Sequence, residues 1–436
     1  MSTDRSHFGR IVSAFLDRTP PQIHDLRLGD GLLPFHRAPH SSPPMSQPSA
    51  PSQSLHGVGA SERLMSLDAL RGFDMMWIVG ADALGHAMSE LDAGPVVKAL
   101  STQLDHVAWA GFRFYDLIFP LFVFMIGVAI TFSLGKLVER QGRAVAVRRV
   151  LQRTLMLYVL GLFYYGGIAK GVDHIRWVGV LQRLGLCYGF AGLCFIYLRP
   201  KQIAAVAVTL LVGYWAALTF IPVPGFGAGD YAEGHNLTNW IDLHYLPGRK
   251  WDVTHDPEGL LSAFPAFVSA LLGVFAGLLL QDRQRTGEQK AVLLATAGCV
   301  SLVLGFTWGI QFPIIKKLWT SSFVLVAGGW SALLLAAFYY VIDVRRVRAW
   351  AVPFTWIGTN ALTIYLIGNL VYVEVGDKGA SAFEQIPQRL VGGPVAAFLD
   401  RAVIPHFGDV VIAIVGLLLA FLICRFLHKR QIFLRL

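Results

Sequence analysis

Apolar runs of about 20 residues recur along this chain and constrain its fold more than any other feature. A helix of that length spans the hydrocarbon core of a bilayer and satisfies its own backbone hydrogen bonds there. Charged residues make up 15% of the chain, against roughly 25% in soluble domains. We therefore predict an all-α polytopic membrane protein with about ten transmembrane helices. The expected spans lie near residues 67–89, 113–135, 150–169, 177–198, 203–221, 260–280, 291–310, 320–342, 352–373 and 409–427.

Two segments differ from these runs. Residues 1–60 are rich in serine and proline and poor in aliphatic side chains, which predicts a disordered tail before a membrane domain over 61–436. The true start is expected either at Met1 or at a later site, with Met65 or an earlier position as the candidate. The short apolar stretch 390–404 contains Asp400 and Arg401, and we expect it to form a surface or re-entrant helix.

Charge alternates between the loops. Basic residues gather in 136–153 and in short loops near 199, 283–290 and 345–348, whereas loops 90–112, 222–259 and 374–408 are longer and more acidic. The positive-inside rule then places both termini in the cytoplasm, as does an even number of spans. The net charge of +9 thus indicates membrane topology, and no nucleic-acid partner is expected. We expect the inner membrane of a bacterium.

Metal and nucleotide motifs are missing from the sequence. The four cysteines lie within apolar runs without CxxC spacing, which predicts buried thiols and neither a disulfide framework nor a zinc site. The chain has no P-loop, HExxH or nucleophile elbow. No metal cofactor is expected.

His106 is the leading candidate for chemistry. It precedes the second span, with Asp116 and Pro120 shortly behind it. Imidazole is the usual general base or nucleophile near neutral pH. A polar group at the edge of lipid costs free energy, which favours a functional role. The alternative is that His106 is an interfacial aromatic residue.

The first span carries a polar stripe. Asp68, Arg71 and Asp82 fall within roughly 60° of one another on a helix, along roughly 21 Å, with Asp74 beside them. Charges deep in a membrane helix pair or line a wet cavity. The alternative for Asp68 is structural. It follows Ser66, a good N-cap, and its carboxylate would stabilise the positive end of the helix dipole.

Other polar residues have structural and functional interpretations. Arg183, beside Gln182, is expected to pair with Asp116, and Asn360 is either glue between helices or functional. Asp256 is expected to cap the sixth span, with Glu258 in its first turn. Snorkelling lysines and an interfacial tryptophan explain the segment Lys316-Lys317-Leu318-Trp319, unless Lys316 neutralises an anionic ligand.

Several blocks in this order resemble the heparan-α-glucosaminide N-acetyltransferase family, over about residues 62–430. They include Ser66-Leu67-Asp68-Ala69-Leu70-Arg71-Gly72, the block from His106 to Pro120, Gly179-Val180-Leu181-Gln182-Arg183-Leu184-Gly185, Asp256-Pro257-Glu258-Gly259, Lys316-Lys317-Leu318-Trp319 and the Asn360 segment. Ile315 and the region of Asp82 depart from the family pattern, which has asparagines there.

The resemblance implies a transmembrane enzyme that passes an acetyl group from cytoplasmic acetyl-CoA, its second substrate, to an amino sugar outside. His106 would be the base or acetyl carrier, Asp116 or Asp82 would orient it, and Asn360 and Gln182 would donate to the oxyanion. Arg71 would bind the anionic end of CoA. The residues expected at the acetyl-CoA site are Asp68, Arg71, Gln182, Arg183, Lys316 and Trp319.

Two other functions remain open from the sequence. A small-molecule transporter uses similar intramembrane charges, and an O-acyltransferase acting on glycan hydroxyls uses similar histidine chemistry. The oligomeric state is also open, with a homodimer among the alternatives.

Overall fold

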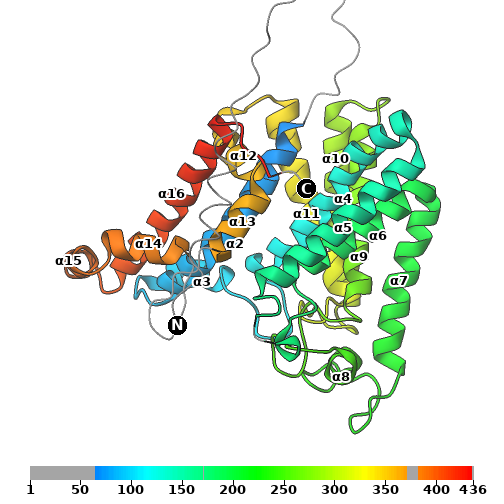
Figure 1. The fold of residues 1–436 in the computed structure, drawn as a ribbon, viewed down its shortest axis with the longest axis horizontal. Coiled ribbons are helices and arrows are strands. Elements are labelled where there is room, and N and C mark those ends of the chain that lie inside the picture. The colour runs from blue at the N-terminus through cyan, green and yellow to red at the C-terminus, as the bar shows by residue number, and fades with distance from the viewer. Residues whose placement is uncertain (1–63, 170, 371–381, 435–436) are drawn as a thin grey trace, which may run out of the picture. The chain divides into compact units, whose positions relative to one another are not determined.

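A computed structural model describes residues 64–169, 171–370 and 382–434 (Figure 1). The predicted tail, 1–60, lies outside these residues. Within the described part every regular element is a helix, and the β-type pairings are isolated bridges between loops. The prediction of an all-helical fold is confirmed.

Seven of the described helices are long and apolar enough to cross a membrane. They are α4 (Phe114–Gln141), α6 (Val180–Tyr197), α7 (Pro200–Phe220), α9 (Ala263–Gln281), α10 (Gly287–Trp308), α11 (Ser321–Tyr339) with its continuation η2 (Tyr340–Val344), and α16 (Phe407–Lys429).

The three other expected spans are also helical, but each departs from a plain apolar span. α2 (Met65–Ser89) carries the polar stripe and α5 (Arg143–Tyr164) begins with a run of arginines. The ninth is not one helix, because it divides into α12 (Val352–Gly358) and α13 (Ala361–Leu370). Thr359 lies at this break, and its hydroxyl donates to the carbonyl of Thr355 at 2.9 Å. Such side-chain bonds compete with helix geometry.

Shorter helices complete the described chain. They are α3 (Gly94–Gln103), η1 (Val172–His174), α8 (Leu237–Tyr245), η3 (Ala349–Ala351), α14 (Ala382–Val391) and α15 (Pro394–Ala402). α15 lies in the stretch expected to form a short surface helix, and none of its residues is buried.

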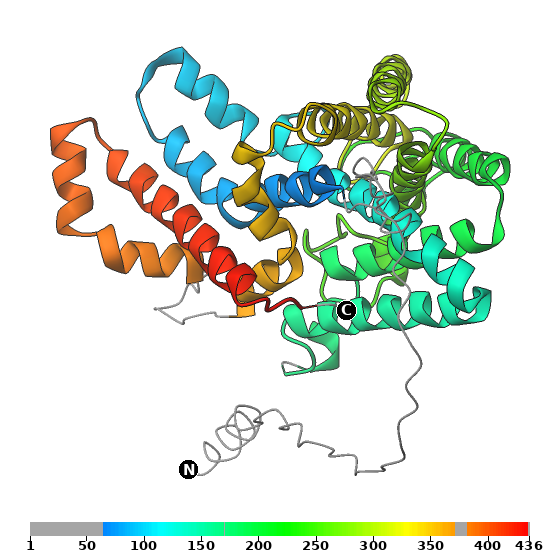
Figure 2. The ribbon, with the colours of Figure 1, turned by 90° about the horizontal axis from the view of Figure 1, so that it is seen from above.

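Glycines let two pairs of helices cross closely. A Cβ added to Gly127 of α4 would lie 1.9 Å from the carbonyl oxygen of Ala270 of α9. At the crossing of α2 and α12, a Cβ on Gly358 would lie 1.8 Å from the carbonyl oxygen of Asp68. Small residues at such crossings are typical of membrane helices. Figure 2 shows α2 beside α12 and α16, both of which pack against it.

The first helix is capped from a distance. The Asp343 carboxylate of η2 accepts from the backbone N–H groups of Met65 at 3.3 Å and Ser66 at 3.1 Å. The expectation that Ser66 caps this helix is therefore wrong, since Ser66 lies inside it. A carboxylate supplied by a distant segment stabilises the positive end of the helix equally well.

Loops from four parts of the chain meet at one end of the helices, the end of α8 in Figure 1. Ala110 pairs with Ile315 and Arg176 pairs with Gly248 in isolated bridges. The Trp109 indole donates to the carbonyl of Tyr231 at 2.9 Å. These contacts bring the segments that carry His106 and Lys316 together.

Candidate active site

His106, Asp116 and Lys316 form one cluster at this end of α4. The Nδ1 atom of His106 lies 2.9 Å from Asp116 Oδ1 and 2.9 Å from Lys316 Nζ. Lys316 Nζ also lies 3.2 Å from Nε2 of the ring and 3.5 Å from Asp116 Oδ1. The side chain of Asp116 is 1% exposed and that of His106 is 49% exposed, so the imidazole presents a free face above a buried carboxylate.

The first turn of α4 fixes the carboxylate. Asp116 Oδ2 accepts from the backbone N–H groups of Arg113 at 3.1 Å and Val107 at 3.3 Å. The first of these bonds is part of the N-terminal capping box of the helix. The ring of His106 stacks on that of Tyr115, with centroids 4.6 Å apart. Capping and stacking together hold His106 in one orientation.

Lys316 is held by backbone pairing. Gly111 N donates to Ile314 O at 2.8 Å, beside the bridge between Ala110 and Ile315. This pairing sets the segment that follows His106 against the segment that contains Lys316.

The contacts of the ring allow distinct roles for its two nitrogens. Nδ1 cannot donate to Asp116 and accept from Lys316 at the same time, because it has either a proton or a lone pair. In the tautomer that donates Nδ1–H to Asp116, Nε2 carries the lone pair. An imidazole oriented in this way by a buried carboxylate is suited to act as a base or nucleophile through Nε2.

A cavity of about 600 Å³ lies between α2, α4, α5, α6 and the α12–α13 break. The α4 residues that line it run from Phe119, one turn beyond Asp116, to Ser133, a length of about 21 Å. Three arginines line the cavity: Arg71, Arg149 and Arg153. Arg149 and Arg153 lie in the part of α5 that follows the short α4–α5 connection, and so belong to the end remote from His106. The remaining lining is mostly apolar.

The polar stripe of α2 contributes partly to this cavity. Arg71 lines it, and Asp68 lies 3.6 Å from the Arg71 guanidinium. Asp74 is fully buried away from it. The side chain of Asp82 lies outside the described residues.

Asn360 lies at the break between α12 and α13. Its amide nitrogen donates to Trp356 O at 3.2 Å, and its buried Oδ1 has no hydrogen-bond partner among the described residues. Its neighbour Thr359 lines the large cavity. The described contacts do not bring Asn360 to His106.

The expected pair between Arg183 and Asp116 is wrong. Arg183 donates to Gly259 O at 3.2 Å and to the Ser262 hydroxyl, and its guanidinium lies over the ring of Trp319. Asp116 instead faces His106 and Lys316, because the loop bridges bring Lys316 to it.

Gln182 and Trp319 are both buried. The Gln182 amide donates to Arg176 O at 3.2 Å. Trp319 is 1% exposed and its indole donates to Ser269 Oγ at 3.1 Å. An interfacial role for Trp319 is therefore wrong. It packs inside the helices, beneath the segment that carries Lys316.

Asp256 does not cap a helix, contrary to expectation. α9 begins at Ala263, and Asp256 instead forms a bidentate ion pair with Arg176 at 2.8 and 2.7 Å. Glu258 contacts the same guanidinium at 2.7 Å. Burial raises the pKa of Asp256, but the hydrogen bonds from Arg176 outweigh it and the pKa is lowered. Arg176 was not singled out from the sequence, because its partners are 80 and 82 residues away.

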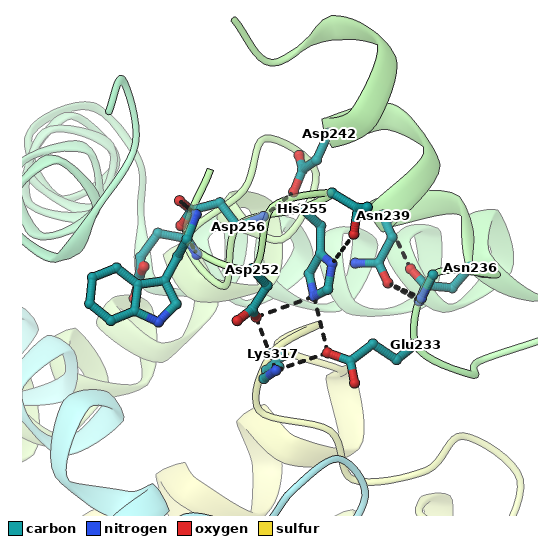
Figure 3. A network of polar contacts seen from close by, with 12 residues as sticks. Glu233, Asn236, Asn239, Asp242, Asp252, His255, Asp256 and Lys317 are labelled. Atoms are coloured by element: carbon teal, nitrogen blue, oxygen red, sulfur yellow. Dashed lines mark hydrogen bonds and ion pairs between the residues drawn. The ribbon is translucent and has the colours of Figure 1, made fainter. Parts of the chain in front are cut away.

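A second ion-pair network surrounds Lys317 (Figure 3). Its ammonium lies 2.8 Å from Glu233 Oε1 and 2.9 Å from Asp252 Oδ2, and His255 faces both carboxylates. Burial opposes protonation of Lys317, but these bonds raise its pKa. Glu233, Asp252 and His255 have ligand atoms spaced closely enough for a metal ion. The Lys317 ammonium already supplies the positive charge at that point.

Comparisons with known proteins identify the family of this chain. The family model described as heparan-alpha-glucosaminide N-acetyltransferase, catalytic, matches residues 63–308. Heparan-alpha-glucosaminide N-acetyltransferase from Homo sapiens is 29% identical over 333 residues, which cover 61% of this chain and 48% of the human protein. The protein of that name from Mus musculus is 28% identical over 321 residues, covering 60% and 48%. The chain spans about half the length of these curated relatives. Because the family model covers more than half of its 436 residues, this chain belongs to the heparan-α-glucosaminide N-acetyltransferase family.

Proposed function

We propose that this protein is a transmembrane N-acetyltransferase that moves an acetyl group from cytoplasmic acetyl-CoA to an amino sugar on the opposite side of the membrane. One observation carries the proposal. The lining of the arginine-lined cavity follows α4 for about 21 Å and ends at Phe119, one turn from Asp116, whose carboxylate contacts His106.

The cavity suits the donor in charge and in length. CoA has an anionic phosphate end and a thioester at the far end of a long arm. Guanidinium groups bind phosphate bidentately, so Arg149, Arg153 and Arg71 would hold the anionic end. The apolar lining from Ile126 to Phe119 would then accept the arm and direct the thioester toward His106.

The reaction joins the amine nitrogen to the acetyl carbonyl carbon and breaks the carbon–sulfur bond. Nε2 of His106 would take the proton from the amine and return it to the sulfur, so that CoA leaves as the thiol. In the alternative sequence, Nε2 attacks first and carries the acetyl group as acetyl-histidine. Asp116 would stabilise the imidazolium in both cases.

Lys316 is the best-placed group for the developing oxyanion. Its ammonium lies beside Nε2, where the carbonyl oxygen would acquire charge. Gln182 and Asn360 were the donors expected from the sequence, but their amide nitrogens bond to the backbone carbonyls of Arg176 and Trp356. We therefore propose Lys316 in their place.

The proposed transfer also requires a particular membrane topology. Ten crossings, comprising the seven apolar helices with α2, α5 and the broken α12–α13, would leave both termini in the cytoplasm. The arginines of α5 would then face the cytoplasm and His106 the exterior, in keeping with the positive-inside rule. For a bacterial chain the membrane would be the inner membrane.

Release of CoA thiol tests the proposal. The purified protein in detergent should release thiol from acetyl-CoA when glucosamine is present, and His106→Ala should abolish this turnover without changing the gel-filtration profile. Thiol release with a sugar that has only hydroxyls would indicate an O-acyltransferase. A protein that releases none with any acceptor would be better described as a transporter.

A further inference from the structure

A second, smaller cavity lies beside His106. Its volume is about 200 Å³, and its walls come from the last turns of α2, the end of α3 and the segment leading into α4. The lining residues are Gly85, His86, Ser89, Ser101, Thr102, Leu104, Asp105 and Arg113. It is a third of the size of the arginine-lined cavity and lies at the N-terminal end of α4, remote from Arg149 and Arg153.

The small cavity is built onto the candidate catalytic residue. Asp105 Oδ1 accepts from the backbone N–H of His106 at 2.8 Å. Arg113 Nη1 donates both to Asp105 Oδ2 at 3.2 Å and to the backbone carbonyl of His106 at 2.9 Å. Two residues that line the cavity thus hold the backbone of His106 on both sides.

The chemistry of the lining suits a carbohydrate. Ser89, Ser101 and Thr102 donate their hydroxyl protons to nearby backbone carbonyls, which leaves oxygen lone pairs able to accept from sugar hydroxyls. The Asp105 carboxylate is 65% exposed and keeps acceptor positions beyond its two present bonds. An ammonium group would find a negatively charged partner there, one residue from the imidazole.

We propose that this cavity is the acceptor subsite and that it takes one terminal amino-sugar ring, with the amine directed past Asp105 to His106. This inference rests on the proposed function and adds the acceptor's position to it. A nucleotide cofactor is too large for the space. Asp105 would hold the ammonium until it loses its proton, and the hydroxyls of Ser89 and Thr102 would bind the ring.

The first test removes two hydroxyls without changing charge. In the double variant Ser89→Ala/Thr102→Val, the KM for glucosamine should rise about tenfold, as expected for two lost hydrogen bonds. The KM for acetyl-CoA should stay at the wild-type value. Thr307→Val, which removes an exposed hydroxyl on α10, is the matched control and should change neither constant. An unchanged KM for glucosamine in the double variant would overturn the inference.

The second test does not depend on turnover. Thr102→Cys is made in a Cys299→Ser background, because Cys299 is the exposed cysteine among the four and the others are buried. Glucosamine, but not glycerol, should slow labelling of the introduced thiol by a charged maleimide in the absence of acetyl-CoA. Equal labelling rates would contradict the acceptor subsite. If the wild-type protein releases no thiol with any amine, the proposed function fails, whereas protection from labelling still reports on the cavity.

Discussion

Asp116 is the residue through which the fold acts most directly on the proposed chemistry. Replacing it with asparagine keeps the shape but removes the charge that stabilises the His106 imidazolium, and the amide can favour the wrong tautomer. We expect kcat to fall by about 100-fold or more, as when the carboxylate of a catalytic triad is neutralised. Steady-state thiol release measures the change. Asp409→Asn, at an exposed carboxylate of α16, is the control, and equal rates for the two variants would contradict the role of Asp116.

Asp242 gives the loops around α8 a stability that depends on pH. It is fully buried, and burial raises its pKa to about 6, although the backbone N–H groups of Leu260 and Asp256 donate to it. Because its pKa in the unfolded chain is about 3.9, its contribution to stability is complete below that pH and is lost as the pH rises through about 6.

The Tm of the protein in detergent, measured against pH, tests the direction of this change in stability. The wild type should lose stability relative to Asp242→Asn between about pH 4 and 6, with a constant difference above that range. A difference in Tm that does not vary over this range would show that Asp242 has an ordinary pKa in the folded protein.

At the scale of elements, α5 is the helix that links the proposed membrane topology to the proposed donor site. The sequence predicted that its arginines belong to an ordinary basic loop. The packing of α5 against α6 shows that Arg149 and Arg153 line a cavity. Arg149→Gln and Arg153→Gln should each raise the KM for acetyl-CoA about tenfold or more through loss of a phosphate contact, with little effect on the KM for glucosamine.

Arg148→Gln provides the matched control on the same helix. Arg148 is exposed and does not line the large cavity, so its loss should leave both KM values near those of the wild type. Equal effects of all three substitutions would indicate that net charge, rather than the cavity, governs the affinity for the donor.

The ends of the helices were harder to predict from the sequence than the helices themselves. Hydropathy predicted the apolar helices, of which seven are long and apolar enough to cross a membrane, because bilayer thickness fixes span length. It did not predict the break at Thr359 and Asn360, where side-chain hydrogen bonds end α12 inside an apolar run. Nor did it predict that Asp256 pairs with Arg176, because capping patterns are local and this ion pair joins residues 80 positions apart.

At the scale of the whole molecule, the sequence indicated the helical fold, His106, and the residue types around it. Asp116 was expected beside His106, being ten residues away on the same stretch of chain. The position of Lys316, 210 residues away, depends on loop bridges that have no sequence signature. Arg183, Gln182 and Trp319 pack in the interior and contact other protein groups. Their place at a cofactor site stays a prediction.

Transfer across a sealed membrane is the sharpest test of whether the acetyl group passes through the helices. The protein is reconstituted in sealed vesicles with acetyl-CoA trapped inside and glucosamine added only outside, with His106→Ala as the control. We predict that N-acetylglucosamine accumulates outside and CoA thiol inside, and that both depend on His106. Product that forms only when acetyl-CoA and glucosamine share one compartment would contradict transfer through the helices.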